Sequence, residues 1–180
     1  MHRQLPSRAG LAVAIAALGL APTAAQAADC LTPPEFTALA TWALPSAIAG
    51  AEERCTPSLP ADAFLRSGGK GLADRYAGGR AAAWPGAKAA ITKISQHADA
   101  NAHNIVEGLP DDTLQQVADT AITTGIADNL PLKRCGTVSR LVELLAPLPP
   151  ENTAALIALA VGLGTATGHT RLGPILVCPA

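Results

Sequence analysis

Apolar residues recur at helical spacing soon after residue 30. The positions Phe36, Leu39, Ala40 and Ala43 follow one another at i, i+3, i+4 and i+7, as on one face of an α-helix. Thr32 can cap this helix, and Glu35 completes a capping box. Because proline removes a backbone donor, we expect the helix to break at Pro45 and to restart over 46–54.

Four later segments carry the same kind of pattern, and they are 85–97, 110–121, 133–145 and 150–163. Proline or acidic residues in the first turn mark most of their starts. Within the last segment, Ala154 to Leu163 contains no polar side chain. A helix that is apolar all round belongs in the centre of a bundle, and this one is shorter than the roughly 20 residues that span a bilayer.

Three stretches lack a sustained period. Residues 56–84 hold several glycines, which disfavour helix by about 1 kcal/mol each, so we expect two short helical pieces joined by mobile turns. Residues 98–104 are polar and are interpreted as a link. Residues 174–178 are expected to form an extended tail tied down by Cys178.

Composition favours helices throughout. Apolar residues make up 49% of the chain and aromatic residues only 3%, so the core must be built from Ala, Leu, Ile and Val. We therefore predict an all-α fold in one domain, residues 28–180. It is a compact bundle of about six or seven short helices around the apolar C-terminal helix, with two disulfides.

Residues 1–27 have the pattern of a secretory signal peptide. Arg3 and Arg8 precede an apolar run from Gly10 to Ala21, and small residues end at Ala27. The run is too short for a membrane-spanning anchor. The sequence therefore predicts export, either to the periplasm or to the extracellular space, with no transmembrane segment in the mature chain.

All four cysteines lie beyond the predicted cleavage site. An even number in an exported chain predicts disulfides, and four cysteines allow three connectivities. Because Cys30 and Cys55 bracket one helical unit and Cys135 and Cys178 bracket another, we expect these two pairs.

The sequence shows no motif for catalysis, metal or cofactor. His97, Asp99, Asn101 and His103 crowd one polar stretch, but their spacing fits no stable ligand pair. Ser67 to Gly71 lacks the spacing of a phosphate-binding loop. The chain has no nucleophile elbow and no zinc-protease helix motif. We accordingly expect no catalytic residue, no metal site and no cofactor.

Charge is uneven along the chain. Without residues 1–27, 11 basic residues face 14 acidic ones, a net charge of −3 that gives no general attraction to nucleic acid. Six basic residues lie between positions 64 and 98, beside three of the five aromatic residues, whereas six acids and no base lie between 99 and 131. The candidate binding residues from this basic segment are Arg66, Lys70, Arg75, Tyr76, Arg80, Trp84 and Lys88.

Two functions remain open at this point. The first is a non-catalytic exported protein that binds a partner protein or an anionic envelope component through the basic segment. The second is a small secreted hydrolase whose dispersed acids and histidines converge in space. A simpler interpretation of the charges is that the basic segment packs against the acidic one. Binding would be favoured by an exposed Trp84 whose flanking cations, Arg75, Arg80 and Lys88, point away from Asp111, Asp112 and Asp119.

Overall fold

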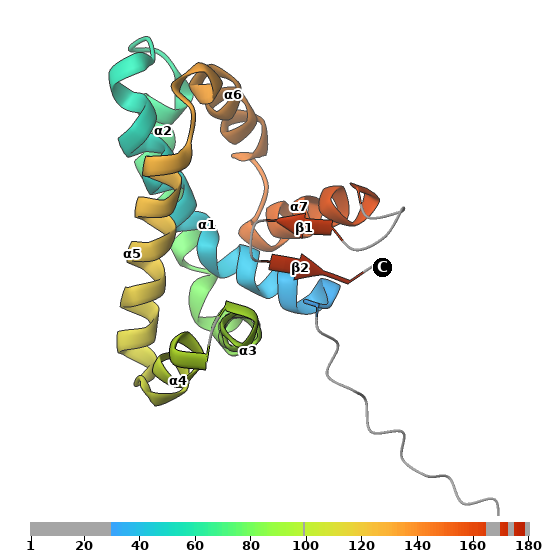
Figure 1. Cartoon of the computed structure of the whole chain (residues 1–180). Coiled ribbons are helices and arrows are strands. Elements are labelled where there is room, and N and C mark those ends of the chain that lie inside the picture. The colour runs from blue at the N-terminus through green and yellow to red at the C-terminus, as the bar shows by residue number, and fades with distance from the viewer. Residues whose placement is uncertain (1–29, 99, 165–169, 173–174, 179–180) are drawn as a thin grey trace, which may run out of the picture.

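The computed structural model describes residues 30–98, 100–164, 170–172 and 175–178, which form seven α-helices and one short hairpin. The α-helices are α1 (Pro33–Cys55), α2 (Phe64–Ala77), α3 (Arg80–Ala98), α4 (Ala100–Gly108), α5 (Asp111–Asn129), α6 (Cys135–Leu145) and α7 (Pro150–Gly164) (Figure 1). Two 3-10 turns, η1 (Thr56–Ser58) and η2 (Leu132–Arg134), precede the strands β1 (Thr170–Leu172) and β2 (Ile175–Val177). The all-α prediction is confirmed. The predicted signal peptide lies outside the described residues.

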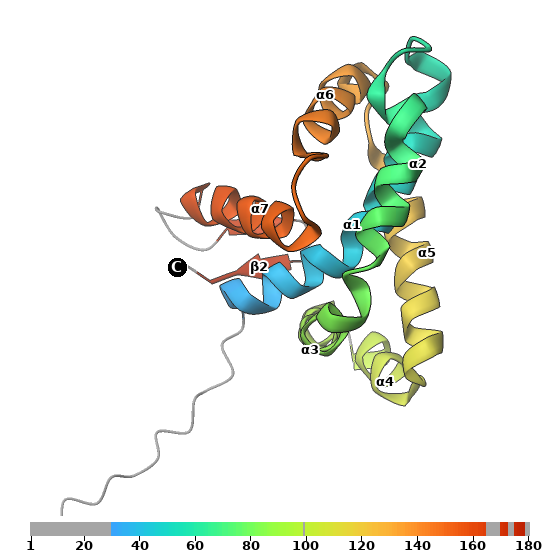
Figure 2. The ribbon, with the colours of Figure 1, turned by 180° about the vertical axis from the view of Figure 1, so that it is seen from behind.

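The central helix is α1, and not the apolar C-terminal helix as predicted. α1 packs against α2, α3, α5 and α7, and the views from both sides show it passing between them (Figure 2). α7 packs mainly against α1 and β1 and leaves Leu156 and Leu159 47% and 58% exposed. The high hydropathy of α7 therefore did not predict its position in the bundle. α1 is central because its length lets it contact four other helices. Among the described helices, none has the length and hydropathy needed to cross a membrane.

The predicted break at Pro45 does not occur. Pro45 is buried inside the continuous helix α1, and Pro85 likewise lies inside α3 rather than at its start. A proline costs a helix interior about 3 kcal/mol, which packing on several sides of α1 can offset. The predicted capping box is present, since the Thr32 hydroxyl accepts from Glu35 N–H and the Glu35 carboxylate accepts from Thr32 N–H.

Two segments expected to be irregular are helical. α2 runs through the glycines of 68–71, and its buried positions Leu65, Leu72 and Tyr76 form one apolar face. The polar link after residue 98 becomes α4. In α2 the packing of this apolar face outweighs the weak helix propensity of glycine.

The disulfides join Cys30 to Cys178 and Cys55 to Cys135, so the predicted pairs are wrong although two disulfides are confirmed. Cα atoms lie 5.1 Å apart in the first pair and 5.3 Å in the second. Both bonds join distant segments of the chain. The Cys30–Cys178 bond holds strand β2 beside the start of α1. There the Cys178 N–H donates to the Leu31 carbonyl at 2.9 Å.

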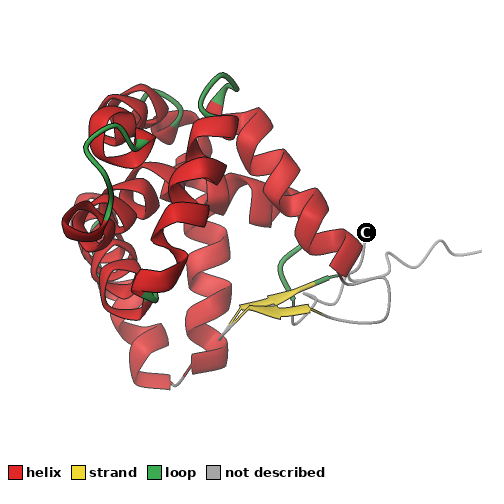
Figure 3. Ribbon diagram, turned by 90° about the horizontal axis from the view of Figure 1, so that it is seen from above, coloured by secondary structure: helices red, strands yellow, loops and turns green. Residues whose placement is uncertain are grey.

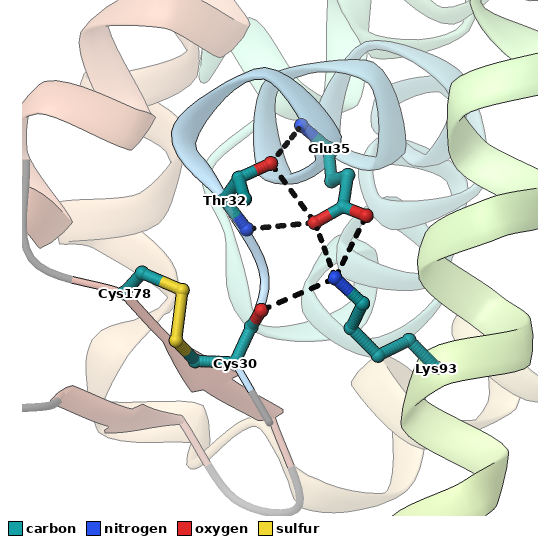
Figure 4. The surroundings of a disulfide bond; sticks show 5 residues. All are labelled: Cys30, Thr32, Glu35, Lys93 and Cys178. Atoms are coloured by element: carbon teal, nitrogen blue, oxygen red, sulfur yellow. Dashed lines mark hydrogen bonds and ion pairs between the residues drawn. A yellow bond between two sulfur atoms is a disulfide. The ribbon is translucent and has the colours of Figure 1, made fainter. Parts of the chain in front are cut away.

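β1 and β2 pair antiparallel, and Figure 3 shows this hairpin at one side of the helices. Val177 of β2 forms an isolated parallel bridge with Leu31. Next to the disulfide, Lys93 of α3 donates to the Cys30 carbonyl and to both carboxylate oxygens of Glu35 (Figure 4). The C-terminal strand, the start of α1 and α3 are thus joined at one place.

Candidate functional site

An apolar groove of about 490 Å³ lies between α1, α3, α4 and α5. Twelve residues line it, and they are Phe36, Leu39, Ala40, Ala43, Ile91, Ile94, Val106, Leu114, Val117, Ala118, Ala121 and Ile122. None of these side chains carries a polar atom. We refer to this hollow as the groove.

The groove arises where predicted core faces meet without filling the space between them. The α1 face and the α5 face that begins at Leu114 are both apolar faces that the spacing predicts. Protein interiors are normally packed to the density of organic crystals. Four of the twelve lining residues are alanines, whose short side chains leave the hollow open.

The groove has a closed floor and an open side. Phe36 and Leu114 are buried, at 6% and 2% exposure, whereas Val117 is 51% exposed. Behind the floor, Trp42 and Trp84 pack with Leu114 in one core cluster, and the centroids of the two indole rings are 5.3 Å apart. Both tryptophans therefore adjoin the residues that line the groove.

A polar cluster joins α3 to the start of α5. Lys88 lies three residues before Ile91 and Asp111 three before Leu114, so each charged residue shares a helix face with a lining residue. Lys88 Nζ is 2.5 Å from one Asp111 carboxylate oxygen, and Trp84 Nε1 donates to the other at 2.9 Å. The hydrogen bond from Lys88, followed by that from Trp84, lowers the pKa of Asp111 below its ordinary value.

The two aromatic residues among the seven predicted binding residues are in the core. Tyr76 is 1% exposed, and its hydroxyl lies 3.0 Å from the Leu145 carbonyl, 3.1 Å from that of Leu148 and 2.9 Å from the Thr153 hydroxyl. Trp84 is 9% exposed. Neither side chain is available as an exposed aromatic platform.

Two cations of that segment face the acidic helix α5. Arg80 pairs with Asp119 at 2.5 Å and stacks 4.2 Å from the centroid of the Trp42 ring. Lys88 pairs with Asp111, as described above. Packing of the basic segment against the acidic one therefore accounts for these two residues.

The other three cations among the candidate residues lie on α2. Arg66 donates to the Leu59 carbonyl, Lys70 pairs with Asp74, and Arg75 donates to the Ala146 carbonyl at 2.7 Å. The seven residues predicted as one binding site are thus divided between the core, the α3–α5 contact and the surface of α2. They do not form one basic and aromatic surface.

A serine, a histidine and an acid lie in a row, as a hydrolase would require. The Ser95 hydroxyl is 3.3 Å from His103 Nδ1, and His103 Nε2 is 3.4 Å from the Glu107 carboxylate. However, Ser95 is 6% exposed and its hydroxyl donates to the Thr92 carbonyl at 2.7 Å. A nucleophile must reach the substrate, so this arrangement is better explained as a contact between α3 and α4.

The described residues hold no group of three or more His, Cys, Asp or Glu side chains that could bind a metal ion. Asp99, one of the four residues considered for metal binding, lies outside the described residues. No family model, curated protein or solved structure matches this chain.

Sequence reasoning missed the groove as a site. The spacing predicts most of its residues as core positions, but it does not predict Val106 of α4 or Ile122 of α5. The available signal was the number of alanines on faces that otherwise carry Leu, Ile and Phe. Such a signal shows that a face is apolar and small, but it does not show which other face lies opposite.

Proposed function

We propose that this protein is an exported, non-catalytic binder of an apolar envelope component, whose hydrocarbon chain lies in the groove between α1, α3, α4 and α5. The observation that carries the proposal is the uniformly apolar lining of a hollow of about 490 Å³. Small-molecule sites typically have volumes of about 300–1,000 Å³. The proposed binding site is therefore the groove, in place of the basic segment between positions 64 and 98 from which the seven candidate residues came.

The lining selects the chemical class of the ligand. A polar group placed among side chains without donors or acceptors loses its hydrogen bonds to water, at a cost of roughly 2–7 kcal/mol. A hydrocarbon chain loses nothing there and gains from leaving water. Hence an acyl or similar chain would occupy the groove, and any headgroup would stay outside it.

The two disulfides fit an exported carrier. Disulfides form and persist in oxidising compartments, and the predicted signal peptide would direct the chain to one. In an aqueous compartment a hydrocarbon chain must be shielded from water, and the groove would bury it. This accounts for the function without a catalytic group, in keeping with the burial of Ser95.

A chain-length series tests the proposal. Straight-chain alkanoates from octanoate to hexadecanoate are titrated below their micelle-forming concentrations, and binding is followed by intrinsic fluorescence of Trp42 and Trp84, the chain's two tryptophans. Each buried methylene contributes about 0.8 kcal/mol, so affinity should rise roughly fourfold per carbon until the groove is full. Affinity that does not depend on chain length would refute the proposal.

Two phenylalanine substitutions on α5 provide the matched comparison. Ala121 lines the groove and is exposed, so Ala121→Phe places a ring in the hollow. Thr124 is exposed on the same helix but does not line the groove. Ala121→Phe should weaken alkanoate binding by roughly tenfold or more, and Thr124→Phe should leave it unchanged. Equal affinity of the two variants would place the ligand elsewhere.

A further inference from the structure

A second surface, independent of the groove, combines exposed leucines with cations along η2 and α6. Leu132, Leu141 and Leu144 are 51%, 54% and 61% exposed. The cations of this segment are Lys133, Arg134 and Arg140, all of them exposed. We refer to these six residues as the α6 stripe.

The leucines of the stripe point away from the protein core. α6 packs against α2, and its buried positions are Cys135 and Ser139, with Val138 and Val142 packed on the same core cluster. Leu141 and Leu144 are three residues apart and thus share a helix face. Their exposure shows that this face is distinct from the one that packs on the core.

The stripe has a local surplus of positive charge on a chain whose net charge is −1. Arg140 pairs with Glu143 at 2.8 Å. Among the described residues, neither Lys133 nor Arg134 has an ion-pair partner. These two cations lie at the N-terminal end of α6, next to Leu132, and the other two leucines lie toward its C-terminal end.

Leucines flanked by Lys and Arg are the pattern of a surface that lies in the interface of an anionic membrane. The apolar side chains enter the boundary between headgroups and acyl chains, and each cation near an anionic surface adds attraction. The exposed leucines of α7 differ in this respect, since no charged residue occurs between Glu151 and Arg171.

We propose that the α6 stripe docks the protein on an anionic lipid surface. α6 is at the top of Figure 1, whereas α3 and α4, two of the helices that line the groove, are at the bottom, and no residue of α6 lines the groove. Docking through α6 therefore leaves the groove uncovered. The inference does not depend on the proposed ligand.

Co-sedimentation with lipid vesicles tests the inference. The protein should bind vesicles that contain phosphatidylglycerol more tightly than vesicles of phosphatidylcholine alone, and added salt should weaken this preference. Lys133→Ala and Arg134→Ala should each weaken binding roughly fivefold. Leu141→Ser with Leu144→Ser should weaken it by roughly tenfold or more. Circular dichroism melting confirms that each variant is folded.

Matched controls come from surfaces outside the stripe. Lys70→Ala removes an exposed cation of α2, and Leu156→Ser with Leu159→Ser removes two exposed leucines of α7. These variants should bind anionic vesicles as the wild type does. Equal losses in the controls and the stripe variants would overturn the inference, as would a wild type that shows no preference for anionic vesicles.

Two further outcomes would also overturn it. The first is a dimer, detected by sedimentation equilibrium without lipid, that Leu141→Ser with Leu144→Ser converts to a monomer. Such a result would assign the stripe to contact with a second copy of the chain. Loss of vesicle binding in Ala121→Phe would show that the groove, and not α6, takes up the lipid. Retained vesicle binding by Ala121→Phe, with lost alkanoate binding, would support both sites separately.

Discussion

Gly86 of α3 lies directly against Ala38 of α1, so that a Cβ added at position 86 would stand 2.6 Å from the Cβ of Ala38. Gly50 of α1 has a similar relation to α5, because a Cβ there would overlap the Thr123 carbonyl oxygen. The two helices that form walls of the groove therefore approach α1 at positions without a side chain.

The first prediction concerns Gly86. Gly86→Ala should destabilise the protein by about 1–3 kcal/mol, because the added methyl group forces α1 and α3 apart. Gly125→Ala on α5 is the control, since a Cβ added there would meet no atom within 4 Å beyond its own stretch of helix. The control should be neutral or stabilising by about 0.5–1 kcal/mol. Urea unfolding measures the stability of both variants. Equal effects would show that the close approach of α1 and α3 does not restrict the size of residue 86.

The second prediction concerns the buried hydroxyl of Tyr76. Tyr76→Phe keeps the ring but leaves the carbonyls of Leu145 and Leu148 without this donor. The expected loss is about 1–3 kcal/mol of unfolding free energy. Thr120→Val removes an exposed hydroxyl bonded within α5 and should change stability by less than about 0.5 kcal/mol. A neutral Tyr76→Phe would contradict the role of this hydroxyl in joining α2 to the α6–α7 connection.

The third prediction concerns the disulfide connectivity. A non-reducing peptide map should recover Cys30 with Cys178 and Cys55 with Cys135. The bonds span 148 and 80 residues, for which the chain-entropy account gives stabilisation of about 4–5 kcal/mol each. Replacing either pair by alanine should lower the denaturant midpoint strongly. Any peptide that joins Cys30 to Cys55 would contradict the structure.

The fourth prediction concerns pH. Burial of Glu35 by itself raises the pKa of its carboxyl group, but hydrogen bonds from Lys93 and Thr32 outweigh burial and lower that pKa below its ordinary value. A carboxylate with a lowered folded-state pKa stabilises the fold above its unfolded-state pKa. That stabilisation is lost as the pH falls through the folded-state pKa.

Glu35→Gln should therefore be less stable than the wild type at neutral pH, and the difference should shrink on acidification. Urea midpoints measured from neutral pH down to below the ordinary pKa of glutamate test this. Glu53→Gln is the control, because Glu53 is exposed and has no ion pair among the described residues. A constant difference between Glu35→Gln and the wild type at every pH would refute the linkage.

Local patterns predicted the elements well where side-chain chemistry acts within a few residues. The capping box at Thr32 and Glu35, the acidic start of α5 at Asp111 and the start of α7 at Pro150 all lie where the sequence placed them. The predictions failed at Pro45 and in the glycine-containing helix α2. The local preference against helix is about 1 kcal/mol for each glycine of α2 and about 3 kcal/mol for Pro45, and packing reverses it at both places.

The sequence alone determined that the protein is helical and that its four cysteines pair, whereas its prediction of a core of Ala, Leu, Ile and Val left out the buried residues Phe36, Trp42, Tyr76 and Trp84. These properties depend on composition and on contacts between near neighbours. Only the tertiary structure decided which cysteines meet, which helix is central and that alanine-rich faces leave a groove between α1, α3, α4 and α5. Each of these depends on which distant segments lie opposite one another, and helical periodicity shows which face is apolar but not what it contacts.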